Sequence, residues 1–99
     1  MIITPLTDQH GVRLAGEVDF SNRLQLETAL ESLADPDTDL YLDLSELTFI
    51  DTGSARLLVV TAARLAPGRR LFLHHPPRPL QRILALLWPN APGIELRLP

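Results

Sequence analysis

One stretch in the middle of the chain constrains the fold more than any other. Residues 40–44 form a short apolar run, which is typical of a strand buried on both faces. After a short loop, Asp51 opens a polar turn of the kind that caps helices. Apolar residues then recur at helical spacing, as Ala55, Leu58, Val59, Ala62, Leu65 and Ala66. A buried strand that leads into an amphipathic helix is the central unit of a parallel α/β sheet.

The rest of the chain alternates between strand and helix patterns. Residues 2–6 and 12–18 predict two strands joined as a hairpin, and Leu26, Ala29, Leu30 and Leu33 form the buried stripe of a helix. After the central stretch come a strand at 70–75, a helix at 80–87 and a closing strand at 94–98. The order β-β-α-β-α-β-α-β predicts one α/β domain over residues 1–99. Its central sheet is mostly parallel, with only the first pair antiparallel, and helices pack against it.

Composition excludes several classes of function. The chain has no cysteine, so disulfides and thiolate metal sites are impossible. A net charge of −3 argues against nucleic acid as the main partner. No apolar run approaches the ~20 residues of a membrane span, so we expect no membrane insertion. The first residues lack the pattern of a signal peptide, which favours a cytoplasmic location.

The residues needed for catalysis are also scarce. All nine basic residues are arginine, so a catalytic lysine is impossible, and so is a receiver-type phosphoacceptor pocket, which needs one. The three histidines are His10 in a turn and the pair His74 and His75 at a strand end, with no neighbouring ligands for a metal. Neither of the glycine-rich stretches resembles a phosphate-binding loop. We therefore expect no metal, no cofactor and no enzymatic activity.

The polar turn is the candidate functional site. Asp51, Thr52 and Ser54 lie at a helix start, where backbone N–H groups point outward and negative charge is favoured. We expect an exposed hydroxyl there, where a phosphate would be well placed. Ordinary capping accounts for one such residue but not for a cluster of three.

The helix after the turn carries an unusual outer face. Its predicted buried stripe leaves Arg56, Leu57, Val60 and Arg64 on the opposite side. Scattered apolar residues are normal on surfaces. Because these adjoin the polar turn, we favour instead a protein-binding face that begins at Ser54 and continues along the helix.

Two motifs resemble the STAS domain family, which includes anti-sigma factor antagonists and the cytoplasmic tails of sulfate transporters. They are Leu-Ala-Gly-Glu-Val-Asp at 14–19 and Tyr-Leu-Asp-Leu-Ser-Glu-Leu-Thr-Phe-Ile-Asp-Thr-Gly at 41–53, and the element order fits across nearly the whole chain. The resemblance implies a four- or five-stranded sheet with helices on one side and a functional turn at the start of the second helix.

The resemblance also implies a switch. In antagonists the turn reads Asp-Ser-Ser-Gly-Leu or Asp-Ser-Thr-Gly-Leu, and an anti-sigma factor kinase phosphorylates the hydroxyl two residues after the Asp, which breaks the complex between the two proteins. Aligned without a gap from Asp51, this position is Gly53, which has no hydroxyl. Thr52 falls on the preceding Ser and Ser54 on the usual Gly. Thr52 and Ser54 are therefore the candidate phosphorylation sites.

We interpret the chain as a regulatory domain that binds a bacterial anti-sigma factor with a kinase-type fold. The partner-binding residues would be Asp19, Asp51, Thr52, Gly53, Ser54, Arg56, Leu57 and Val60. Asp19 matches the acidic residue that ends the second strand in the family, although it could equally cap a helix. Two alternatives stay open: a docking subunit on the ABC-type ATPase of a transport system, and a nucleotide or ligand sensor. A homodimer also stays open.

Overall fold

The computed structural model describes residues 1–98 and has the predicted order of elements. Within that range a five-stranded sheet is accompanied by three helices. The strands are β1 (Ile2–Pro5), β2 (Gly11–Val18), β3 (Leu40–Ile50), β4 (Leu71–His74) and β5 (Ile94–Arg97), and the helices are α1 (Arg23–Leu33), α2 (Thr52–Ala63) and α3 (Arg78–Leu87). No helix in this range is both long and apolar enough to cross a bilayer.

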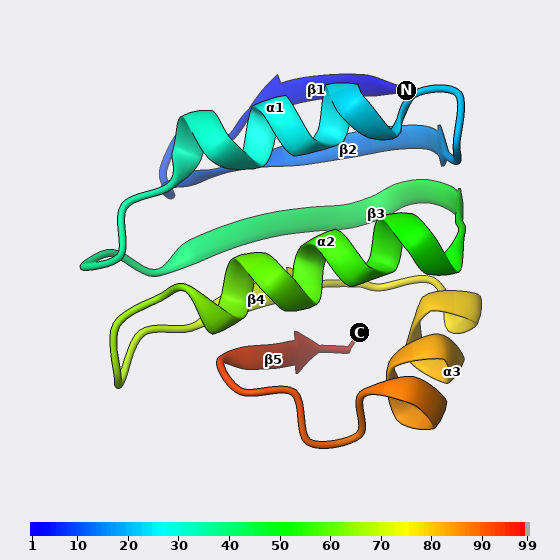
Figure 1. Ribbon diagram of the computed structural model, residues 1–99. Coiled ribbons are helices and arrows are strands. Elements are labelled where there is room, and N and C mark those ends of the chain that lie inside the picture. The colour runs from blue at the N-terminus through cyan, green and yellow to red at the C-terminus, as the bar shows by residue number, and fades with distance from the viewer. Residues whose placement is uncertain (99) are drawn as a thin grey trace.

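The sheet has the predicted strand directions. Its strands lie in the order β1-β2-β3-β4-β5; β1 pairs with β2 antiparallel, and every other pair is parallel. Figure 1 shows α1 and α2 side by side across one face of the sheet, and α3 contacts α2 and β3. The α/β class and the single antiparallel pair are thus confirmed.

A leucine-rich core fills the space between the helices and this face. β3 contributes Leu40, Leu42 and Leu44, which alternate along the strand and are at most 2% exposed. Each helix adds its own stripe to the same cluster: Leu26 and Leu30 from α1, Leu58 and Ala62 from α2, Leu80 and Leu84 from α3. The predicted periodicities of α1 and α2 therefore hold, whereas that of α3 holds up to Leu84 and fails at Leu87, which is 54% exposed. The helices cover one side of the sheet.

The opposite face of β3 is only half-buried, so the expectation of burial on both faces is wrong. Tyr41 and Asp43 point to this side, where no helix contributes to the core within residues 1–98. The apolar character there comes from a local stack instead. The rings of Tyr41 and Phe72 lie 4.7 Å apart, and the Arg97 guanidinium covers Phe72 at 4.6 Å from the ring centroid. The Arg97 guanidinium and the Tyr41 ring together shield Phe72 from solvent on this uncovered face of the sheet.

β3 is longer than the sequence predicts. The expected loop at 45–50 is strand, and it pairs with the second half of β2 up to Val18 opposite Ile50. Irregularities in β2 on either side of Gly16, which has a φ of +95°, shift the register. As a result, the buried residues are Leu44, Leu47 and Ile50, a spacing of three that hides the strand period. The extended strand delivers the chain directly to the start of α2.

Candidate functional site

Asp51 is the single residue between β3 and α2, and it caps the helix. Its backbone is extended, with φ −81° and ψ 169°, and its side chain accepts a hydrogen bond from the Ser54 backbone N–H at 2.8 Å. Its own N–H donates to the carbonyl of Val18 at 3.1 Å, which ties the turn to the end of β2. The predicted cap is therefore present, and the turn is anchored to the sheet on one side and the helix on the other.

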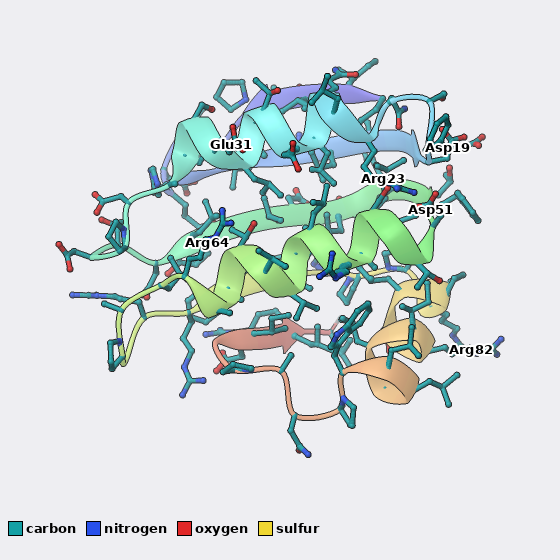
Figure 2. All side chains as sticks on the ribbon, in the orientation of Figure 1. Asp19, Arg23, Glu31, Asp51, Arg64 and Arg82 are labelled. Carbon is teal, nitrogen blue, oxygen red and sulfur yellow. The ribbon has the colours of Figure 1, made fainter. Side chains whose placement is uncertain are left out.

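Arg23, which sequence reasoning missed, holds the turn from α1. Its Nη2 donates to Asp51 Oδ2 at 2.9 Å, and its Nε donates to Ser54 Oγ at 3.2 Å. Figure 2 shows Arg23 and Asp51 meeting at one end of the sheet. Burial raises the pKa of Asp51, but the hydrogen bonds from Ser54 and the Arg23 guanidinium outweigh it and hold the pKa below its usual value. The turn thus carries a paired carboxylate.

The guanidinium of Arg23 lies directly over Gly53. A Cβ atom at position 53 would be 2.5 Å from Nη2 and 2.6 Å from Cζ, which is far inside contact distance. Only glycine fits while Arg23 stays in place. The position where the STAS resemblance implies a phosphorylatable hydroxyl is therefore covered by a cation.

One sequence signal could have pointed to Arg23. It stands at the first position of α1, where the helix dipole disfavours a positive charge. A cation at that end of a helix needs compensation from elsewhere, and here Asp51 supplies it across 28 residues of sequence. The sequence does not say which acid compensates it, because the contact is between two elements.

Ser54 is buried, so the expectation of an exposed hydroxyl is wrong for this residue. Its exposed fraction is 0%, and its Oγ accepts the hydrogen bond from Arg23. The reason is helical phase: Ser54 precedes Leu58 by four residues and lies on the same inward face. Thr52, at the first position of α2, is exposed as expected. The turn therefore offers one accessible hydroxyl and one enclosed one.

Asp19 lies at the same end of the sheet, as Figure 2 shows. Its Oδ1 accepts hydrogen bonds from the Ser21 hydroxyl at 2.6 Å and the Ser21 N–H at 2.9 Å, and these bonds lower the pKa of Asp19. The carboxylate thus shapes the loop between β2 and α1. Phe20, next in the chain, is 84% exposed, and its ring centroid lies 6.0 Å from Arg23 Cζ. The only sequence signal for Phe20 is its position directly after Asp19.

The predicted outer face of α2 divides into two parts. Arg56 and Arg64 are exposed, whereas Leu57 and Val60 are half-buried. Leu57 and Val60 line a cavity between α1 and α2 rather than facing open solvent. The structure therefore places Arg56 near the turn and the two aliphatic residues in a groove farther along the helix.

Metal ligands do not gather anywhere in residues 1–98: no three His, Asp or Glu side chains are close enough to hold an ion together. His74 is half-buried beside Tyr41, with ring centroids 5.6 Å apart. His75 directly follows β4 with a φ of 52°, and its N–H donates to the carbonyl of Arg97. The histidine pair therefore belongs to the sheet and not to the turn.

Comparisons with known proteins agree with the fold. A family model described as "Mlab, STAS domain" matches residues 4–88. Among solved structures, the anti-sigma factor antagonist SpoIIAA in its unphosphorylated form is similar, with a TM-score of 0.64 over 96% of this chain and 87% of that chain. The identity is 19%, so this likeness shows the fold. No curated protein matches the sequence significantly.

Proposed function

Because this chain belongs to the STAS family, we propose that it is a protein-binding regulatory domain of the anti-sigma factor antagonist type. The observation that carries this proposal is the anchored turn at the start of α2, where Thr52 stands exposed beside the paired side chains of Asp51 and Arg23. A turn fixed by a cap and an ion pair presents a preorganised contact surface, which lowers the entropic cost of binding. Its partner is a bacterial anti-sigma factor with a kinase-type fold, in the cytoplasm.

The proposed contact surface begins at the turn and continues onto the helix. It comprises Asp19, Asp51, Thr52, Gly53, Ser54, Arg56, Leu57 and Val60, with the enclosed Ser54 supporting the surface rather than touching the partner. The half-buried aliphatic residues supply apolar area and Arg56 supplies charge, which is the composition of interface cores and their rims.

Thr52 is the residue that we propose for phosphorylation. Its hydroxyl is accessible, whereas Ser54 is 0% exposed and Gly53 has none. A phosphate on Thr52 would add about 1.5 to 2 negative charges to a surface fitted to a neutral hydroxyl. Phosphorylation would therefore release the partner.

A second candidate function rests on Arg23 and Gly53. A guanidinium covers the position of the usual acceptor, so this turn suits a domain that docks without being switched. In that case the partner is the ABC-type ATPase of a transport system. The two functions differ in the partner and in the presence of a phosphate.

Capture of the partner from the native host distinguishes the two candidate functions. Tagged wild-type chain, Thr52→Ala and Thr52→Asp serve as baits, and the phosphorylation sites of the recovered bait are mapped by mass spectrometry. Thr7→Asp is the matched control, because Thr7 is exposed in the β1–β2 turn at the other end of the sheet.

We expect the wild type and Thr52→Ala to recover a kinase-type anti-sigma factor, Thr52→Asp to lose it, and Thr7→Asp to retain it. Phosphate on Thr52 would support the switch. Recovery of a transport ATPase with no phosphate on Thr52 would instead support the docking subunit. Capture that is unaffected by Thr52→Asp would exclude the turn as the contact surface.

A further inference from the structure

A groove lies between α1 and α2, away from the turn. Its volume is about 370 Å³. Its leucine and valine lining comes from both helices, from the segment after α2 and from the start of β3: Leu30, Leu33, Leu40, Leu57, Val60 and Leu65. Leu57 and Val60, the aliphatic residues on the outer side of α2, therefore line an apolar groove. An exposed apolar groove is typical of a binding site.

The rim of the groove is charged asymmetrically. On the α1 side stand Glu27, Glu31 and Asp35, and on the α2 side stands Arg64. Figure 2 shows Glu31 on α1 and Arg64 at the end of α2, on the two sides of the groove. Among residues 1–98, neither Glu27 nor Glu31 takes part in an ion pair. The α1 side therefore offers free negative charge to a ligand.

The groove is continuous with the surface proposed for the partner. Thr52 opens α2, and Leu57 and Val60 lie one and two turns farther along the same helix. A partner that contacts the turn and follows α2 must therefore pass over the groove.

We propose that the groove binds an amphipathic helix of the protein partner, with aliphatic side chains in the hollow and Lys or Arg side chains against Glu27 and Glu31. This inference rests on the proposed function, since it names the chemistry of the partner segment. An apolar helix face fits an apolar groove between two helices. The carboxylates of the α1 rim repel anionic amphiphiles and favour a basic helix.

The test uses peptides of defined chemistry on the full chain labelled with ¹⁵N. An amphipathic helical peptide of leucine and lysine is titrated while backbone amide shifts are recorded. A peptide of the same pattern with glutamate in place of lysine, and one with serine in place of leucine, are the controls. We expect the leucine–lysine peptide alone to shift amides of residues 27–35 and 57–65.

Two variants then assign the contacts. Glu27→Gln combined with Glu31→Gln should weaken binding of the peptide about tenfold, because two rim charges are lost. Glu17→Gln is the matched control; Glu17 is exposed on β2, away from the groove, and should leave the affinity unchanged. Val60→Thr keeps the shape of the side chain and should also weaken binding.

Several results would overturn the inference. They are equal binding of the glutamate peptide, shifts spread over the open sheet face, and equal weakening by Glu17→Gln. If the groove amides shift with protein concentration alone, the groove binds a second copy of this chain. If they respond to 1-octanol but not to the peptide, the groove binds a small molecule. Capture by the Thr52 variants is judged separately, so failure here leaves the proposed function standing.

Discussion

The packing of Arg23 on Gly53 predicts a reversal in the effect of one substitution. In Gly53→Ala, the new Cβ would lie 2.5 Å from Nη2, so the guanidinium must move away. It then gives up its ion pair with Asp51 and its hydrogen bond to Ser54 Oγ. If Arg23 is removed first, the same methyl group meets no such obstacle.

The magnitude follows from the two lost contacts. The ion pair joins side chains that are 35% and 26% exposed, which limits it to about 0–1 kcal/mol. The hydrogen bond to buried Ser54 is worth about 0.5–1.5 kcal/mol. Against this loss, alanine is favoured over glycine in a helix by up to ~1 kcal/mol. We expect Gly53→Ala to destabilise the wild type by about 0.5–1 kcal/mol and to stabilise Arg23→Ala by a similar amount, about the range found for coupled neighbours.

Urea unfolding of the four proteins in this cycle measures the coupling, followed by circular dichroism and by the fluorescence of the single tryptophan. Arg56→Ala provides the matched background, because Arg56 is exposed on the same helix as Gly53. There, Gly53→Ala should behave as it does in the wild type. A shift of the midpoint in the same direction and by the same amount with and without Arg23 would refute the reasoning.

Three further expectations concern the core, the groove and acid. Leu58→Ala should cost ~2–5 kcal/mol in thermal or urea unfolding, since Leu58 is 0% exposed; a negligible loss would contradict the helix phase. Val60→Glu should abolish capture of the partner while the melting temperature, measured by calorimetry, stays nearly constant; a large fall would make Val60 a core residue. Burial raises the pKa of Asp43, but hydrogen bonds from Ser45 and Arg13 outweigh it and bring the pKa to about 2, from an ordinary 3.8. Because the pKa of Asp43 is lower in the folded state, the ionised carboxylate stabilises the fold above about pH 4. This contribution is lost as the pH falls, so the free energy of unfolding should drop between about pH 4 and pH 2. Acid unfolding of Asp43→Asn should be less steep in this window, and an unchanged slope would exclude Asp43 as a contributor.

The element order and the core could be predicted because they depend on local periodicity. Leu26 and Leu30, Leu58 and Ala62 repeat at helical spacing, and that spacing is visible without any partner. The extent of β3 could not be predicted in this way, because its last buried residues follow a register set by irregularities in β2. The length of β3 therefore depends on its pairing with β2 and not on its own sequence alone.

The position of the turn between β3 and α2 could be predicted, but its side-chain contacts could not. A polar cluster before an amphipathic helix indicated the turn, and Asp51 caps the helix as that pattern implies. The enclosed hydroxyl of Ser54 could have been read from its spacing to Leu58. The role of Arg23 could not be predicted, because the guanidinium reaches Asp51 and Ser54 from another helix, and the sequence does not show that contact.

The spatial order of the strands has a consequence for synthesis. Because β1 to β5 lie in the sheet in the same order as in the chain, each strand joins the free edge left by the one before it. No gap must be held open for a strand that arrives later. Ribosomes deliver about 5–20 residues per second, so the N-terminal strands emerge before the C-terminal ones. A nascent chain of this topology can add its sheet one strand at a time, with β5 closing the series.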